Sequence, residues 1–221
     1  ERGNQSPENF PAMVAYLDRM VGEFLAKLDS LGLAENTLVI FLGDNGTGVE
    51  ITSRFKGEPY PGGKGRSHAR GTHVPLIARW PGRIKRGVVT NEIAASIDLL
   101  PTFAAFADAH LPPHKIDGLN LAPFLTGAAA KSPRDDFYYY AAPTNYLAAD
   151  GRPANQRNLV AVRSGPWKLH TTTGALYNLR EDTGEQQDVA AKYPQIAARL
   201  RSMGERFDTA IAAEVRPLGS I

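Results

Sequence analysis

The sequence contains no cysteine, which excludes disulfide bonds, thiolate zinc sites and cysteine nucleophiles within the chain. It has no apolar run approaching ~18 residues, so no transmembrane helix is expected. Neither sign of charge dominates, because 25 Lys and Arg residues face 23 Asp and Glu residues, for a net charge of +2. There is no long run of like charge and no RNA- or DNA-binding motif. We therefore expect no nucleic-acid partner and no membrane span.

An initiating methionine is also missing, and the first residues, Glu-Arg-Gly-Asn-Gln-Ser, lack the character of a signal peptide. We expect the chain to be a piece of a longer protein. Its 221 residues suffice for one large domain, or for one domain and a small second one.

The first strong pattern is a helix followed by a buried strand. Apolar residues recur every three or four positions between Pro11 and Gly32, which are typical start and stop signals. The run from Leu38 to Leu42 is apolar without a break, which is typical of a central strand covered on both faces. Helix, short turn and buried strand together predict half of a parallel α/β unit.

Asp44 and Asn45 follow this strand directly, where α/β sheets commonly bind ligands. A carboxylate and an amide supply hard oxygens, which suit Ca²⁺ or Mg²⁺ better than zinc. The alternative is a simple turn, because Asp-Asn-Gly tolerates tight backbone geometry.

The segment from Thr47 to Thr72 is glycine-rich and shows no clear periodicity, so we expect a long functional loop. Glycines on both sides of Lys64 would let its backbone and ammonium approach an anion closely. The spacing does not fit a P-loop, and a solvated surface lysine is the alternative. Arg66 and His68 on the same loop are candidate substrate-binding residues, although an exposed loop histidine is the alternative for His68.

Further along, residues 74–80 predict another short strand, and Asp98 is a candidate helix cap before Pro101. We place a domain boundary at 130/131, so that residues 1–130 belong to an α/β domain and 131–221 to a small α+β unit. That unit has strands at 137–140, 159–163, 167–170 and 175–179, with a hairpin around 164–166 and a terminal helix from Pro194. Tyr138 to Tyr140 could contact a sugar or aryl group, but packing is favoured, and His170 is interpreted as structural.

A series of motifs, individually weak, follows the order and spacing of the sulfatase family, which the chain therefore resembles over nearly its whole length. The motifs are Leu38 to Gly46, Gly63-Lys64-Gly65, Gly71 to Ile77, Trp80-Pro81-Gly82, Ile97-Asp98 with Pro101-Thr102, Ile116 to Leu119, Leu121 to Gly127, Ala161-Val162-Arg163, Trp167-Lys168-Leu169, Leu176 to Leu179, Asp182 and Glu185.

The resemblance implies an alkaline phosphatase-like mixed sheet flanked by helices, with Asp44 and Asn45 as calcium ligands and Lys64 in contact with the sulfate ester. Ca²⁺ would act as a Lewis acid on a sulfate oxygen. The family's formylglycine comes from a Cys/Ser-x-Pro-x-Arg motif that this chain does not contain. The chain alone is therefore predicted to be catalytically incomplete, and Ala69 stands where the family commonly has an acidic residue that would help to order the loop.

The implied substrate is a sulfate ester, which could belong to a sulfated glycan, and the implied location is periplasmic or secreted. Two other functions fit the same residues: a phosphodiesterase or phosphonate hydrolase of the same superfamily, and a non-catalytic module that binds sulfated glycans. A sheet that is cut in half would expose an apolar edge, so we also expect the chain to self-associate.

Overall fold

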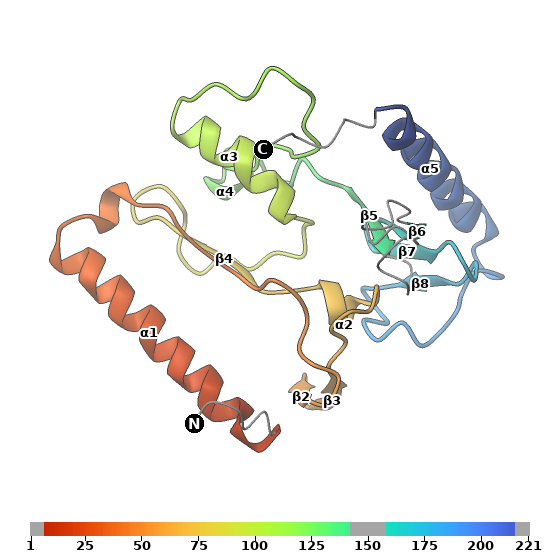
Figure 1. Ribbon diagram of the computed structural model, residues 1–221, viewed down its shortest axis with the longest axis horizontal. Helices are drawn as coiled ribbons and strands as arrows, with labels where there is room; N and C mark the ends of the chain where they lie inside the picture. The colour runs from red at the N-terminus through yellow and green to blue at the C-terminus, as the bar shows by residue number, and fades with distance from the viewer. Residues whose placement is uncertain (1–6, 142–157, 215–221) are drawn as a thin grey trace, which may run out of the picture. The chain divides into compact units, whose positions relative to one another are not determined.

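A computed structural model describes residues 7–141 and 158–214 (Figure 1), so the expectation about the first six residues falls outside the described part. The chain forms two compact units, one made of residues 1–66 and 70–133 and the other of residues 67–69 and 134–221. The sequence-based domain boundary at 130/131 stays a prediction, because these units are defined by contacts alone. No helix in the described residues is long and apolar enough to cross a membrane.

The first unit begins with a short 3-10 helix, η1 (Pro7–Asn9), and the long helix α1 (Phe10–Ser30). Pro11 lies in the first turn of α1, and Gly32 follows its end with φ 67, as the start and stop signals predict. The apolar stripe is present but largely exposed, since Met13 and Phe24 keep 59% and 54% of their surface accessible.

A second 3-10 helix, η2 (Ala34–Asn36), leads into strand β1 (Val39–Leu42), which pairs antiparallel with β4 (Leu76–Arg79). The expectations of a parallel unit and of a strand covered on both faces are wrong for the described residues. The long loop after β1 brings the chain back in the opposite direction, and all four residues of β1 are half-buried.

The long loop is more ordered than expected, because it contains a β-hairpin of β2 (Thr52–Phe55) and β3 (Glu58–Pro61). Lys56 and Gly57 form its two-residue turn with φ values of 53 and 88, which match the twist of the flanking strands. Every residue of β2 is exposed, so the strand has no alternation of apolar and polar residues to reveal it. The short helix α2 (Ala69–Thr72) ends the loop.

The rest of the first unit contains η3 (Ser96–Asp98) and the helices α3 (Leu99–Phe106) and α4 (Ala122–Leu125). Asp98 is fully buried, and its carboxylate accepts hydrogen bonds from the amides of Ala95 at 2.9 Å and Leu119 at 2.8 Å. The side chain therefore caps η3 and fixes the segment before α4, which makes Asp98 a structural residue, although it does not cap α3 itself.

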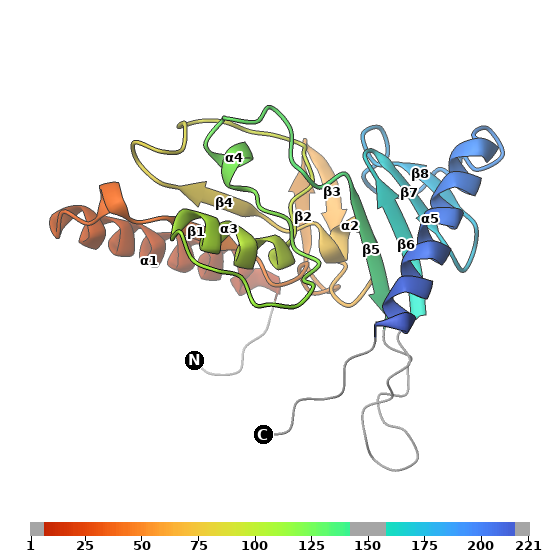
Figure 2. The ribbon, with the colours of Figure 1, turned by 90° about the horizontal axis from the view of Figure 1, so that it is seen from above.

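The second unit closely follows the sequence prediction. Strands β5 (Asp136–Ala141), β6 (Asn158–Ser164), β7 (Trp167–His170) and β8 (Leu176–Asn178) form one antiparallel sheet in sequence order. Helix α5 (Pro194–Ala213) lies along one face of this sheet (Figure 2), and Val162, Leu169, Leu176 and Leu200 are completely buried in the core between them.

The tyrosines of β5 pack within this unit. Tyr138 stacks on Phe207 of α5 with ring centroids 3.7 Å apart, and the Tyr140 hydroxyl donates to Asp208 of the same helix at 2.9 Å. Both side chains are therefore engaged in attaching α5 to the sheet, in agreement with the packing interpretation.

Candidate functional site

Asp44 and Asn45 lie in a bend directly after β1. The Asn45 amide nitrogen donates a short hydrogen bond to the Asp44 carboxylate, so the two side chains lie side by side. On either side of them, the Gly43 amide donates to Pro75 O at 3.1 Å and the Gly46 amide to Gly71 O at 2.9 Å. The bend is thus fixed at both ends, and it presents a carboxylate and an amide together, as a hard cation requires.

The lysine loop is hydrogen-bonded to the chain just after this bend. The Thr47 carbonyl accepts from the amides of both Gly63, at 3.0 Å, and Lys64, at 2.9 Å. The structure therefore brings the backbone of Lys64 next to the residue that lies three positions after Asp44. In the part of the chain that the structure describes, the Lys64 side chain is exposed and has no hydrogen bond or ion pair.

The glycines of this region allow the backbones to pack against each other. A Cβ on Gly46 would lie 2.0 Å from the carbonyl oxygen of Arg70, and one on Gly71 would lie 2.2 Å from that of Arg66. A Cβ on Gly63 would lie 2.8 Å from the Arg70 side chain. These distances are too short for any side chain, so glycine is required here for close packing, in addition to the anion access inferred from the sequence.

Lys64 and Gly65 occupy the middle of a tight turn. The Arg66 amide donates to Gly63 O at 2.9 Å, and Gly65 has φ 80, which glycine adopts without strain. Arg66 is exposed, like Lys64. Two cationic side chains are thus presented from one ordered turn.

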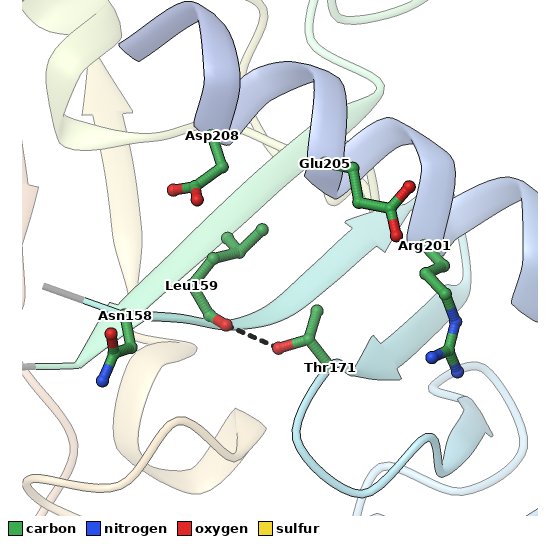
Figure 3. A pocket seen from close by; sticks show the side chains of 6 residues that line it. All are labelled: Asn158, Leu159, Thr171, Arg201, Glu205 and Asp208. Atoms are coloured by element: carbon green, nitrogen blue, oxygen red, sulfur yellow. Dashed lines mark hydrogen bonds between the residues drawn. The ribbon is translucent and has the colours of Figure 1, made fainter. Parts of the chain in front are cut away.

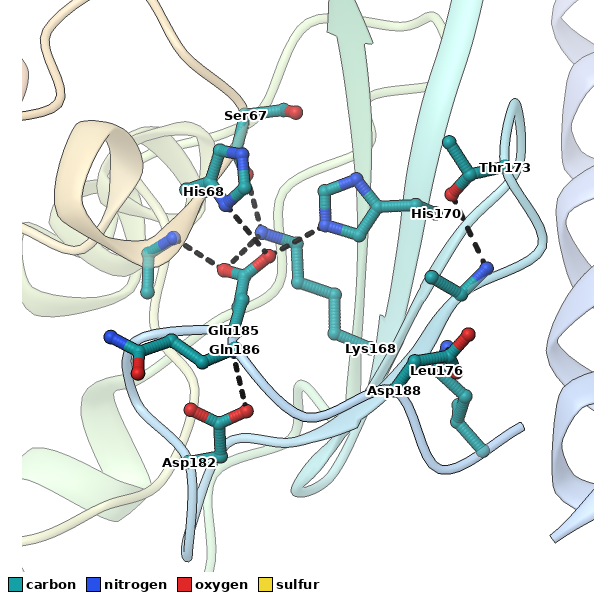
Figure 4. A network of polar contacts seen from close by, with 12 residues as sticks. Ser67, His68, Lys168, His170, Thr173, Leu176, Asp182, Glu185, Gln186 and Asp188 are labelled. Atoms are coloured by element: carbon teal, nitrogen blue, oxygen red, sulfur yellow. Dashed lines mark hydrogen bonds and ion pairs between the residues drawn. The ribbon is translucent and has the colours of Figure 1, made fainter. Parts of the chain in front are cut away.

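His68 lies elsewhere, in a network of polar contacts within the second unit (Figure 4). At the centre is the Glu185 carboxylate, which is fully buried. Its Oε1 accepts from the Lys168 ammonium at 2.9 Å and from the Ala69 amide at 2.6 Å. Its Oε2 lies 2.6 Å from His170 Nε2 and 3.5 Å from His68 Nδ1. His170 is thus held by a hydrogen bond to a buried carboxylate, which supports its structural interpretation.

The network shifts the pKa values of both buried charges. Burial raises the pKa of Glu185, but the hydrogen bond from His170, the charge and hydrogen bond of Lys168 and the Ala69 amide together lower it to about 2. Burial lowers the pKa of Lys168, and the attraction to Glu185 opposes this shift. Glu185 is therefore fully ionised near neutral pH.

His68, His170 and Glu185 also form a group that could hold a metal ion, since their ligand atoms lie within 4.8 Å of one another. Two imidazoles and one carboxylate would suit zinc rather than calcium. However, Lys168 places a positive charge on the same carboxylate, and this charge disfavours a divalent cation there. The other histidine pair of the chain, His110 and His114, is exposed in a loop.

Sequence reasoning did not identify this network. Glu185 is separated from Lys168 by 17 residues and from Ala69 by 116, so no local spacing connects them. One signal was available, because Lys168 and His170 alternate on β7 and must therefore share a face of the sheet. They lie on the face opposite Leu169, and an ammonium that is buried there requires a carboxylate partner.

A shallow hollow of about 320 Å³ also lies in the second unit (Figure 3), and none of the predicted site residues lines it. Its walls come from β6, the turn after β7, and the polar face of α5. It is lined by Asn158, Leu159, Thr171, Arg201, Glu205 and Asp208.

Comparison with known proteins identifies the family. The family model described as Sulfatase matches residues 1–109, and the one described as N-sulphoglucosamine sulphohydrolase, C-terminal, matches residues 64–210. Human arylsulfatase A is 34% identical over 92% of this chain and 43% of its own length. Mouse steryl-sulfatase is 31% identical over 90% of this chain and 36% of its own length. The chain thus spans less than half the length of these relatives.

Solved structures show the same fold. A protein solved in complex with its substrate D-glucosamine-2-N,6-O-disulfate matches 91% of this chain and 40% of its own, with a TM-score of 0.71 and 24% identity. A sulfatase from Pseudoalteromonas sp. matches 92% of this chain and 43% of its own, with a TM-score of 0.72 and 22% identity. Because a family model covers most of the chain and relatives above 30% identity cover about nine tenths of it, this chain belongs to the sulfatase family.

Proposed function

We propose that this chain is the C-terminal section of a calcium-dependent sulfuric ester hydrolase, in which Asp44 and Asn45 bind Ca²⁺ and Lys64 contacts the sulfate group. Membership of the sulfatase family supports the reaction class. The observation that carries the assignment of residues is the Thr47 carbonyl, which accepts from both Gly63 and Lys64 and so holds the lysine turn beside the Asp44 bend.

The donor atoms of the bend fit calcium. The Asp44 carboxylate and the Asn45 amide both offer hard oxygen atoms, and the hydrogen bond that the Asn45 amide nitrogen donates to Asp44 keeps the two side chains together. Ca²⁺ takes about six to eight oxygen ligands, so the remaining ones would come from other parts of the full-length protein and from the substrate. When bound, the ion would supply Lewis-acid stabilisation of charge on a sulfate oxygen.

Lys64 would add a second positive centre for the same oxyanion. Its ammonium is exposed and has no partner among the described residues, so binding a sulfate would not require it to leave another group. Arg66 is presented from the same turn and is a second candidate for substrate contact. His68 stays a candidate, although it contacts Glu185, because 42% of its side chain is exposed.

The nucleophile would come from outside these residues. No cysteine is present, and no serine is followed by proline at two and arginine at four positions, as formation of formylglycine requires in this family. We infer that the formylglycine segment lies in another part of the full-length protein. The proposed substrate is a sulfate ester of a glycan or aryl alcohol, and the periplasmic or secreted location is proposed from the family alone.

The test uses the full-length protein encoded by the gene and measures hydrolysis of an aryl sulfate with and without a calcium chelator. Lys64→Ala and Asp44→Ala should each lower kcat/KM by about 100-fold or more, since each removes stabilisation of charge at the sulfate. Lys85→Ala, which removes an exposed lysine of the same unit, is the matched control and should change kcat/KM less than twofold.

Three outcomes would contradict the proposal. Full activity in both Lys64→Ala and Asp44→Ala would show that the site is wrongly assigned. A preference for phosphodiesters over sulfate esters would favour the other hydrolases of the superfamily. Binding of sulfated glycans without any turnover would favour a non-catalytic module.

A further inference from the structure

The two fully buried charges of the second unit are directed at one short segment of the long loop. Lys168 and Glu185 have no solvent-exposed side-chain surface. Lys168 donates a short hydrogen bond to Ser67 O, and Glu185 accepts from the Ala69 amide. His68, between these two residues, lies 3.5 Å from Glu185 through its Nδ1. All three residues of the segment Ser67–Ala69 are therefore bound by this pair.

Stability alone does not account for such a pair. Removing two charges from water costs several kcal/mol per ion, and a well-packed apolar pair of similar size is often at least as stable. The core beside it is already apolar, with Leu169 and Leu176 completely buried. What an apolar pair could not do is bind a backbone carbonyl and a backbone amide at defined positions. The charges thus serve to fix the chain at Ser67–Ala69.

The segment that they fix follows the lysine turn directly. Arg66 donates to Gly63 O to close the turn, and Ser67 is the next residue. On the other side, Gly63 and Lys64 are bonded to Thr47 O. The backbone at Lys64 is therefore constrained before the turn by the Thr47 carbonyl and after it by the Lys168–Glu185 pair. Only Gly65 and Arg66 lie between Lys64 and Ser67, so a loss of either constraint would let the turn move.

We propose that Lys168 and Glu185 are positioning residues, which hold Ser67–Ala69 and thereby fix the turn that presents Lys64 and Arg66. This inference rests on the proposed function for its consequence in catalysis, but the fixing of the segment can be measured without any substrate. Lys168 and Glu185 are not expected to touch the substrate. They act through the backbone of the loop.

The first experiment measures amide hydrogen exchange in the 221-residue chain. In Lys168→Met, the Ser67 carbonyl loses its donor, and the peptide covering residues 64–70 should exchange at least tenfold faster than in the wild type. Trypsin should also cut faster after Lys64 and Arg66. Asp188→Asn is the matched control, because Asp188 accepts from the amides of Leu176 and Ala190 and does not contact the segment.

A second variant separates loop fixing from general destabilisation. The double variant Lys168→Met/Glu185→Gln leaves no unpaired buried charge, so the second unit should regain much of its stability, while the Ser67 carbonyl still lacks its donor. Exchange at residues 64–70 should therefore stay at least fivefold above the wild type. The proposal would be overturned if residues 64–70 exchanged at the wild-type rate in both variants. It would also be overturned if these residues exchanged as fast in Asp188→Asn as in Lys168→Met.

The last experiment measures kcat and KM in the full-length protein. Lys168→Met/Glu185→Gln should lower kcat/KM for an aryl sulfate by about tenfold, while Asp188→Asn should leave it within twofold. If exchange rises but kcat/KM is unchanged, the segment is fixed but does not position a catalytic group. If Lys64→Ala also leaves kcat/KM unchanged, the proposed function has failed and the fixing of the segment still stands.

Discussion

Replacing Lys168 with methionine is the perturbation for which the structure predicts the clearest energetic result. The variant keeps the length of the side chain but leaves the fully buried Glu185 without its cation. The hydrogen bond from His170, the charge and hydrogen bond of Lys168 and the Ala69 amide lower the pKa of Glu185 from an ordinary 4.5 to about 2 in the folded chain, against the effect of burial. At 1.36 kcal/mol per unit, the interactions that favour the carboxylate exceed its burial cost by about 3 kcal/mol.

Breaking a buried ion pair on one side typically costs 3–5 kcal/mol, because it leaves an uncompensated charge. In Lys168→Met the Ala69 amide and His170 still donate to Glu185, so we expect the lower end, about 3 kcal/mol, at pH 7. The double variant with Glu185→Gln should be less destabilised than Lys168→Met alone. This order of stabilities indicates that an unpaired buried charge destabilises Lys168→Met. If lost contacts were the only cause, the double variant would be less stable than the single variant.

The pH dependence has a defined sign. A carboxylate whose folded pKa is lowered contributes stability above its unfolded pKa and loses it as the pH falls through the folded value. In the wild type this contribution is thus lost between pH 4.5 and about 2. In Lys168→Met, the charge and hydrogen bond of Lys168 no longer lower the pKa of Glu185, so its carboxyl is protonated at a higher pH than in the wild type, and protonation relieves the penalty. The difference in unfolding free energy between the two proteins should therefore shrink as the pH falls from 7 to 3.

Urea unfolding, followed by tryptophan fluorescence, can measure this difference in unfolding free energy in the second unit alone. The chain has two tryptophans, and a Trp80→Phe background leaves only Trp167, which lies on β7 next to Lys168. The unfolding free energies of Trp80→Phe and of Trp80→Phe/Lys168→Met should be compared at several pH values. A penalty that is constant from pH 7 to pH 3, or below 1 kcal/mol at pH 7, would refute the reasoning.

Three further predictions follow from the packing. Gly63→Ala should destabilise the first unit by about 2 kcal/mol in urea unfolding, because its Cβ would lie 2.8 Å from Arg70, whereas Gly65→Ala faces open space and should cost only about 1 kcal/mol for its φ of 80. Leu200→Ala should cost about 2–5 kcal/mol in the same measurement on the second unit, because Leu200 is completely buried between α5 and the sheet. The 221-residue chain should self-associate in light scattering through the exposed apolar stripe of α1, and a clean monomer at about 50 μM would contradict this.

The elements that sequence patterns predicted well are those whose signals are local. Helix α5 combines a proline start with an apolar stripe, and the β6–β7 hairpin places Gly165 at a turn where φ is 54. The antiparallel pairing of β1 with β4 could not be predicted, because the direction of β4 depends on the path of more than 30 intervening residues. The β2–β3 hairpin escaped prediction because β2 has no buried face.

The candidate site also contains residues that local sequence signals mark and residues that only the fold brings together. Asp44, Asn45 and Lys64 are candidates because short motifs mark them, a strand end for the first two and a glycine cluster for Lys64, and their roles stay predictions. Glu185 is different, because its partners are a lysine 17 residues away, a histidine 15 residues away and a backbone amide 116 residues away. Such a network exists only after the chain has folded, so an isolated sequence pattern cannot reveal it.

The glycine-rich loop shows why a flexible composition does not imply a flexible site. Its glycines remove side chains where backbones meet, and this close packing fixes Lys64 and Arg66 on an ordered turn. Fixing the backbone of one residue costs about 1–2 kcal/mol of conformational entropy. Folding has already met this cost for the turn, so binding of an anion need only restrict the two side chains. A loop of the same charge without these contacts would bind an anion more weakly.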